Sequence, residues 1–306
     1  MHNPNKAEKK EVVNAIIRNF AKTFRMMCKN DMSDMGPIGV FDSGFGGLSI
    51  LRDLRQALPQ YDYLFLGDNA RAPYGSRSYQ LVYEFTLQAV KYLFSRGCRL
   101  VILACNTASA KALRTIQQRD LPTLDPTRRV LGVIRPTAEQ AGRLSRTGHV
   151  GVFGTPGTIG SGSYDIEIKK LHEGFHVYGH ACPMWVPLVE NRESDGPGAD
   201  YFVKKDVEAL LSQSPLIDAI ILGCTHYPLL LDKIRRYVPE DVKIVGQGAI
   251  VADSLRDYLQ RHPEMERRLS RGGGCEYLTT EEPEKFSPLA SVFVREPVSA
   301  AHVTLA

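Results

Sequence analysis

The sequence predicts an α/β protein of two similar parallel-sheet αβα domains, related by a pseudo-two-fold, with the active site in the cleft between them. Short apolar runs alternate with helical patterns along most of the chain, as is typical of parallel βαβ units. Two of these runs, 100–104 and 219–223, lead directly into cysteines, Cys105 and Cys224. The same pattern in both halves of the chain predicts a duplicated unit.

Runs of branched aliphatic residues bounded by small or turn-forming residues predict the strands in order. We expect strands at 37–41, 62–67, 99–104, 130–134, 149–153, 175–180, 217–222 and 242–245. After them, residues 249–260 predict a helix, and 277–280 predict a late strand behind the glycine run 272–274. Because these elements follow the second unit, we expect the chain to return to the first domain.

The predicted division of the chain therefore has a discontinuous first domain. We expect an N-terminal extension at 1–36, a first domain at 37–129 and 246–306, and a second domain at 130–245. Three pairs of segments support the duplication, at separations of 112, 114 and 119 residues. They are Gly39 with Gly151, Pro73 with Pro187, and Cys105 with Cys224.

The extension has apolar residues at helical spacing, among them Val12, Ile16 and Phe20, with basic residues largely between them. This pattern predicts an amphipathic helix that lies on the folded body or on a membrane surface. An alternative is that translation starts at Met35. We expect deletion of residues 1–34 to leave activity intact.

The composition of the chain is that of a globular protein and argues against several other classes. A charged fraction of 24% and a hydrophobic fraction of 43% are those of a globular protein, and a net charge of +4 does not call for a nucleic-acid partner. No apolar stretch reaches the roughly 20 residues of a membrane span. The six cysteines are scattered without a CxxC pair, which argues against a disulfide framework and a structural zinc site. We expect a reducing, cytoplasmic setting.

The positions of Cys105 and Cys224 favour chemistry over packing. Each follows a predicted buried strand, and ligands bind at that edge of open α/β sheets. A metal site needs more soft or imidazole ligands than these thiols and His226 supply, and a redox pair needs thiols within disulfide reach. Two thiols on opposite sides of one carbon can instead remove and return a proton, which predicts a two-base racemase.

The residues beside the two thiols suit such a reaction. Asp42 and His226 are placed to orient protons, and Asn106, Thr107 and Thr225 can donate hydrogen bonds to substrate carboxylates. The glycine-rich loop 42–47 does not fit a dinucleotide or nucleotide motif, since the GxGxxG spacing and the Walker lysine are missing. Its backbone N–H groups suit a single carboxylate of a small ligand.

Five separated motifs resemble the signatures of bacterial glutamate racemase, in the aspartate/glutamate racemase family, and they occur in order. They are GVFDSG (39–44), GDNARAPYG (67–75), ACNTAS (104–109), CPMWVPLVE (182–190) and LGCTHYP (222–228). The resemblance runs from about Pro37 to the C-terminal region. It implies a cofactor-independent isomerase that interconverts L- and D-glutamate and supplies D-glutamate for peptidoglycan.

The resemblance also implies roles for single residues. Cys105 would act on the D-enantiomer and Cys224 on the L-enantiomer, with Glu190 as an assistant near His226. Contacts with substrate, or tuning of the thiols, would come from Asp42, Ser43, Tyr74, Gly75, Asn106, Thr107, Thr225 and His226. No metal is implied. The resemblance further implies a homodimer whose partner is the small-molecule substrate glutamate.

Other interpretations stay open at this point. The same paired thiols would serve a racemase of aspartate or another small amino acid, and a noncatalytic amino-acid binding protein would also have a cleft between two α/β units. Asp42 and His226 could cap helices, Tyr74 could be packing, and Glu190 could be an ordinary surface carboxylate. We expect Trp185 in the core and structural roles for Cys28, Cys98, Cys182 and Cys275.

Overall fold

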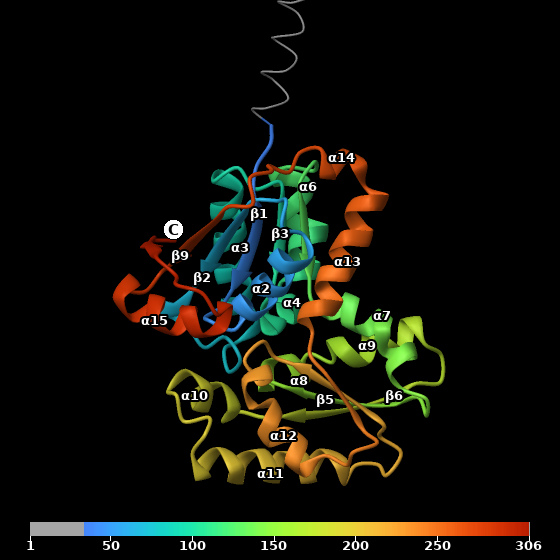
Figure 1. Ribbon diagram of the computed structural model, residues 1–306. Helices are drawn as coiled ribbons and strands as arrows, with labels where there is room; N and C mark the ends of the chain where they lie inside the picture. Colours follow the sequence, from blue (N-terminus) through green and yellow to red (C-terminus); the bar gives the residue numbers. More distant parts are fainter. Residues whose placement is uncertain (1–33, 306) are drawn as a thin grey trace, which may run out of the picture.

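The computed structural model describes residues 34–305, and the strands of this part of the chain form two parallel sheets (Figure 1). The first sheet has the order β10-β9-β2-β1-β3-β4. Its strands are β1 (Ile38–Asp42), β2 (Tyr63–Gly67), β3 (Leu100–Leu103), β4 (Arg129–Gly132), β9 (Cys275–Thr279) and β10 (Ala300–His302). Every residue of β1, β2 and β3 is buried, as expected for parallel strands with both faces covered.

The second sheet has the order β6-β5-β7-β8. Its strands are β5 (His149–Gly154), β6 (His176–Ala181), β7 (Ala219–Gly223) and β8 (Lys243–Val245). The strands β2-β1-β3-β4 of the first sheet and β6-β5-β7-β8 of the second sheet have the same spatial order relative to their order in the chain. The predicted duplication is therefore present in the strand order, and Cys105 and Cys224 follow equivalent strands.

One strand lies in a different sheet from the one predicted. The sequence predicts the strand near residue 130 as the start of the second domain, but β4 pairs in parallel with β3, with Val101 opposite Val130. After β3 the chain passes through a helical segment and returns, so that β4 lies at the open edge beside β3. In the second sheet the equivalent strand, β8, lies beside β7 in the same way. We therefore propose that the second unit begins after β4 and extends over 133–245.

Helices fill the connections between strands. In the first part of the chain they are α2 (Gly47–Ala57), α3 (Tyr79–Ser95), α4 (Asn106–Lys111), α5 (Leu113–Thr115) and α6 (Leu121–Leu124), with short turns η1 (Asn69–Arg71) and η2 (Ile116–Asp120). The second unit contains α7 (Ile134–Leu144), α8 (Pro156–Gly160), α9 (Ser163–Leu171), α10 (Trp185–Glu190), α11 (Pro197–Leu211), η3 (Tyr227–Leu230) and α12 (Leu231–Tyr237).

The C-terminal segment returns to the first sheet, as predicted. It contains α13 (Gly248–Arg261), α14 (Pro263–Glu266) and α15 (Pro283–Val294), drawn in orange and red in Figure 1. β9 pairs with β2, and both α13 and α15 pack against α2. The strand β10 adds to this edge and is an element that the sequence does not predict.

The predicted amphipathic helix of the extension lies outside the described residues, but residues 34–36 of the extension are part of the folded body. Asp34 forms ion pairs with Arg99 and Arg268, and Gly36 forms a parallel bridge with Leu269. The proposed extension therefore joins the first domain before residue 37.

The apolar core continues from one domain into the other. One cluster of buried side chains includes Val40 of β1, Phe153 of β5 and Leu222 of β7, together with Trp185, which is fully buried as predicted. Between residues 34 and 305, helices with the length and hydropathy of a membrane span are absent.

Candidate functional site

The carboxyl ends of the central strands of both sheets meet at one cavity of about 170 Å³. Cys105 lines it from the first domain and Cys224 from the second. All the other site residues predicted from the sequence line it as well, except Asp42, which is buried directly behind Ser43. The two cysteines therefore share one small cavity, as the mirrored motifs predict.

Cys105 stands at the N-terminus of α4, where the apolar strand β3 gives way to small and polar residues. Its Sγ accepts a hydrogen bond from the backbone N–H of Ala108 (3.4 Å) and lies 3.3 Å from Ser43 Oγ. Burial, followed by the negative charge of Asp42, raises the pKa of Cys105 to about 12. The Cys105 side chain is therefore a thiol at neutral pH when no ligand is bound.

Asp42 ends β1 and is only 1% exposed. Its Oδ2 accepts a hydrogen bond from the N–H of Gly44 (2.9 Å), whereas its buried Oδ1 has no hydrogen-bond partner among the described residues. Burial raises the pKa of the Asp42 carboxyl, and the charge of His226 and the N–H groups of Gly44 and Gly47 oppose the shift. A buried charged acceptor without a partner is costly, which is the same effect that raises the pKa of this carboxyl.

Cys224 follows β7 and faces a histidine and a carboxylate arranged in series. His226 Nδ1 lies 3.8 Å from Cys224 Sγ, and its Nε2 lies 3.1 Å from Glu190 Oε1. Burial alone would lower the pKa of His226, but its hydrogen bonds with Cys224 and Glu190 outweigh burial and raise it to about 10. At neutral pH the imidazole is therefore protonated, and both ring nitrogens can donate.

Asn106 lines the cavity, but its side-chain amide is already engaged by the protein. Its Nδ2 donates to Gln247 Oε1 (2.6 Å), and its Oδ1 accepts from the hydroxyl of Tyr164 (2.8 Å). Gln247 Nε2 in turn donates to the Tyr164 hydroxyl (2.8 Å) and to Thr137 Oγ1 (3.0 Å). This network joins the residue after Cys105 to the second domain and to the segment that leads into α13.

Hydroxyl groups of the two domains also meet beside the cavity. Thr107 Oγ1 lies 2.9 Å from Thr155 Oγ1 and 3.3 Å from Thr158 Oγ1. Across the cleft, the backbone oxygen of Thr225 accepts a hydrogen bond from Ser49 Oγ (3.2 Å). The Thr225 side chain is itself in the cavity wall.

Tyr74 and Gly75 close another side of the cavity. The Tyr74 hydroxyl donates to Asp68 Oδ2, and burial, followed by the charge of Asp68, raises the pKa of Tyr74 far above its usual value. The carbonyl of Gly75 accepts from the N–H of Gly157 (2.8 Å) in the other domain. A side chain at position 75 would approach Thr155 Cβ to 2.8 Å, which explains why glycine stands there.

Several residues at the cavity were not predicted as site residues. Cys182 lines it, and Tyr164 and Gln247 hold Asn106. Thr155, which the duplicated pattern indicates as the counterpart of Ser43, also lines the cavity and follows β5 as Ser43 follows β1. The other contacts join residues that are far apart in the sequence and have no local signal.

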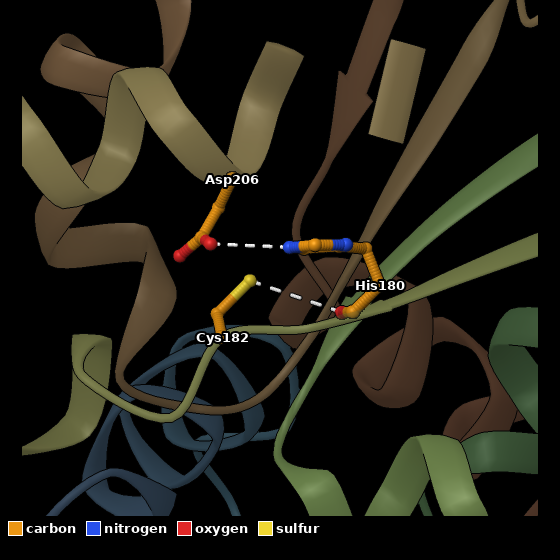
Figure 2. A group of neighbouring side chains, drawn as sticks. All are labelled: His180, Cys182 and Asp206. Atoms are coloured by element: carbon orange, nitrogen blue, oxygen red, sulfur yellow. Dashed lines mark hydrogen bonds and ion pairs between the residues drawn. The ribbon is translucent and has the colours of Figure 1, made fainter. Parts of the chain in front are cut away.

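Cys182 also lies beside His180 and Asp206, as Figure 2 shows. The ligand atoms of His180, Cys182 and Asp206 all lie within 4.8 Å of one another. The sequence predicts no metal site, and only the packing of α11 on β6 brings Asp206 to the other two residues.

Comparisons with known proteins agree with this geometry. The family model of Asp/Glu/hydantoin racemases matches residues 38–287. A glutamate racemase of Ruegeria sp. (strain TM1040) is 42% identical over 272 residues, covering 86% of this chain and 98% of that protein.

Solved structures show the same similarity. A glutamate racemase isoform of Bacillus anthracis superposes with a TM-score of 0.80 at 34% identity, covering 88% of this chain and 98% of that chain. A Francisella tularensis glutamate racemase, solved in complex with D-glutamate, has a TM-score of 0.76 at 30% identity, with 89% and 98% covered. The predicted fold class, two parallel-sheet α/β domains, is confirmed.

Proposed function

Since the chain belongs to the glutamate racemases of the Asp/Glu/hydantoin racemase family, we propose that it interconverts L- and D-glutamate by a cofactor-independent two-base reaction. The observation that carries this proposal is the position of Cys105 and Cys224. They come from equivalent strands of the two domains and line the same small cavity. An α-carbon held between them would have one thiol on each face.

In the proposed reaction one cysteine acts as thiolate and the other as thiol. Starting from L-glutamate, the Cys224 thiolate takes the α-proton, so that the C–H bond breaks and an S–H bond forms. Cys105 then gives its thiol proton to the opposite face of the α-carbon, which yields D-glutamate and leaves Cys105 as thiolate. The reverse reaction exchanges the roles.

His226 and Glu190 would serve the Cys224 half of the reaction. The protonated imidazole donates towards the sulfur, and a positive charge there stabilises the negative charge that forms on it. Glu190 accepts from the other ring nitrogen and so keeps the imidazole charged and oriented. We therefore assign Glu190 as a positioning residue that acts through His226.

Asp42 and Ser43 would serve the Cys105 half. The positive charge of a substrate α-ammonium group in the cavity would offset the repulsion between the buried Asp42 carboxylate and a Cys105 thiolate. The Ser43 hydroxyl, 3.3 Å from Cys105 Sγ, can donate to that thiolate. Substrate binding would thus help to make the thiolate that the D-enantiomer requires.

Hydroxyl groups in the cavity wall would bind the substrate carboxylates. We assign this role to Thr107 and Thr225, with Tyr74 and Gly75 shaping the wall. Asn106 has a different assignment from the one the resemblance implies. Because its Nδ2 donates to Gln247 and its Oδ1 accepts from Tyr164, we propose that it positions the start of α4, with its second N–H group left for the cavity. As part of the same proposal, the D-glutamate formed supplies peptidoglycan synthesis in the cytoplasm, and the active protein is a homodimer.

Circular dichroism of the substrate tests the proposal. Purified protein, without added cofactor, is mixed with L-glutamate or with L-aspartate, and the optical signal is followed to equilibrium. We expect the glutamate signal to decay to zero, with the rate lowered about 100-fold or more in Cys105→Ser and in Cys224→Ser. Cys275→Ser is the matched control, because this thiol lies outside the cavity and its loss should leave the rate unchanged.

Other outcomes would change the conclusion. Decay with aspartate alone would replace the substrate, and no decay with either amino acid would favour a binding protein. Full activity in either cavity-cysteine variant would contradict the two-base reaction.

A further inference from the structure

The second domain carries a group of side chains that the racemase reaction does not use, formed by His180, Cys182 and Asp206 (Figure 2). His180 lies near the end of β6, and Cys182 follows it by two residues, so that their side chains leave the extended backbone on the same face. Asp206 reaches them from α11, which packs against β6. The end of β6 and the packing of α11 against it therefore bring three different ligand atoms close together.

We propose that His180, Cys182 and Asp206 form a binding site for a zinc-class divalent cation in the wall of the cleft. An imidazole nitrogen, a thiolate and a carboxylate oxygen are all ligands that Zn²⁺ accepts, whereas Ca²⁺ and Mg²⁺ prefer oxygen alone. The site would have three protein ligands and a fourth position open to water. On binding, the Cys182 thiol loses its proton to solvent, and no electron is transferred.

The distances suit this geometry. Zinc bonds of about 2.0–2.3 Å at tetrahedral angles place neighbouring ligand atoms about 3.3–3.8 Å apart. His180 Nε2 lies 3.1 Å from Asp206 Oδ1, and the largest separation within the group is below 4.8 Å. Small side-chain rotations would therefore bring all three atoms to bonding distance of one cation.

Cys182 adds a third potential ligand to the hydrogen-bonded pair of His180 and Asp206. The Cys182 thiol donates a weak hydrogen bond to the carbonyl of His180 at 3.8 Å. Burial and the neighbouring Asp206 carboxylate raise the pKa of Cys182, so a bound cation is needed to compensate the charge of its thiolate. Asp206 is 6% exposed and His180 is half-buried, so the site lies under the surface but can be reached from solvent. Elsewhere in residues 34–305 no other three ligating side chains come so close, and the cavity residues Cys224, His226 and Glu190 do not form such a group.

A cation bound at this site would contact a residue of the cavity wall. Cys182 lines the cavity, and its carbonyl accepts a hydrogen bond from the hydroxyl of Tyr227, the residue after His226. Its N–H donates to the carbonyl of Gly154 at the end of β5 (2.9 Å). A cation held by Cys182 therefore connects α11 to the turn that forms one wall of the cavity.

Direct metal binding tests the proposal independently of racemisation. The full chain is freed of metal with a chelator, kept reduced with a phosphine, and titrated with Zn²⁺ in competition with a chromophoric chelator. A parallel titration with Co²⁺ reports thiolate ligation by its sulfur-to-cobalt charge-transfer absorption. We expect one equivalent of metal per chain, and an affinity at least about 100-fold lower in Asp206→Asn and in His180→Gln.

The matched control is the double variant Cys105→Ser/Cys224→Ser, which should bind zinc and show the cobalt band as the unaltered chain does. Cys182→Ser should lose the band, and if this buried substitution prevents folding, Asp206→Asn and His180→Gln carry the test without removing a thiol. Binding that survives Asp206→Asn but disappears in the double variant would overturn the proposal, because the metal would then sit on the cavity thiols. The absence of any stoichiometric binding would overturn it equally.

Discussion

Glu190 Oε1 lies 3.1 Å from His226 Nε2, and this pair holds a charged imidazole against Cys224 in the interior of the protein. The histidine is 4% exposed, so its proton depends on the two neighbours rather than on water. The Cys105 side has no equivalent cation in the described residues, only the Ser43 hydroxyl, a backbone N–H and the nearby carboxylate of Asp42. The two halves of the site are therefore electrostatically unlike.

Replacing Glu190 by Gln should weaken the charge on His226 and so affect the Cys224 half of the site. Because the pKa of His226 is raised to about 10 in part by Glu190, the variant should lose the imidazole proton closer to neutral pH. We expect the alkaline limb of the pH profile for L-glutamate to move to lower pH and the rate at pH 8 to fall about tenfold. NMR titration of the imidazole checks the cause, and Glu193→Gln on the surface is the control. An unmoved profile would contradict the role of Glu190.

The raised pKa of His226 also makes the stability of the protein depend on pH. A histidine whose pKa is raised on folding contributes stability that is complete below its usual pKa of about 6.5 and is lost as the pH rises through about 10. Denaturant unfolding should therefore show a decline between these values that is smaller in Glu190→Gln. An equal decline in both proteins would contradict the pairing.

Gln247 holds Asn106 and Tyr164 in one buried network, so its loss should cost both stability and rate. Gln247→Ala removes the acceptor of the Asn106 Nδ2 group and the donor to the Tyr164 hydroxyl, which should lower the free energy of unfolding by about 1–3 kcal/mol. Tyr164→Phe removes one hydroxyl and should cost about 1 kcal/mol. Denaturant unfolding and kcat of both variants check this, and a Gln247→Ala protein as stable as the original would contradict it.

Gly46 is needed for the approach of the two domains behind Cys224. A Cβ at this position would meet Thr225 Oγ1 and come within 2.6 Å of His226 Nδ1. We expect Gly46→Ala to lower the free energy of unfolding by about 1–3 kcal/mol and to reduce racemisation, because the turn that holds His226 must shift. Gly160→Ala is the matched control, since nothing lies within 4 Å of its Cβ. Equal behaviour of the two variants in activity and unfolding would contradict this reading.

Asp34, a residue of the predicted N-terminal extension, forms ion pairs with the first domain. Its ion pairs with Arg99 and Arg268 are partly exposed, so Asp34→Ala should cost no more than about 1 kcal/mol of stability. Removal of residues 1–33 should leave racemisation unchanged, and a truncation that also removes Asp34 should show only this small loss. Thermal unfolding and the circular dichroism assay compare the three proteins. A folded but inactive truncation would contradict the expectation.

Strands such as β1, β3 and β7 could be predicted from the sequence because parallel strands buried on both faces are continuous apolar runs. Cys105 and Cys224 could be predicted because each stands at the end of such a run. The sheet to which β4 belongs could not, since it depends on which edge the returning chain joins. The short β10, with the sequence Ala-Ala-His, has no strand signal of its own.

The rest of the site depends on contacts between distant parts of the chain. Gln247 meets Asn106 across 141 residues, and no local pattern distinguishes either amide from one in a loop. The same holds for Asp206, which joins His180 only because α11 packs on β6. Motifs at strand ends thus reveal the reacting groups, while the residues that position them require the packed structure.

The most direct measurement starts from L-glutamate in D₂O and follows the α-position of both enantiomers during the first part of the reaction by NMR after chiral separation. If Cys224 removes the proton and Cys105 supplies another to the opposite face, the D-glutamate formed will carry deuterium while the remaining L-glutamate keeps its proton. D-glutamate that retains the original proton, or L-glutamate that gains deuterium as fast as product appears, would mean that a single base works on both faces.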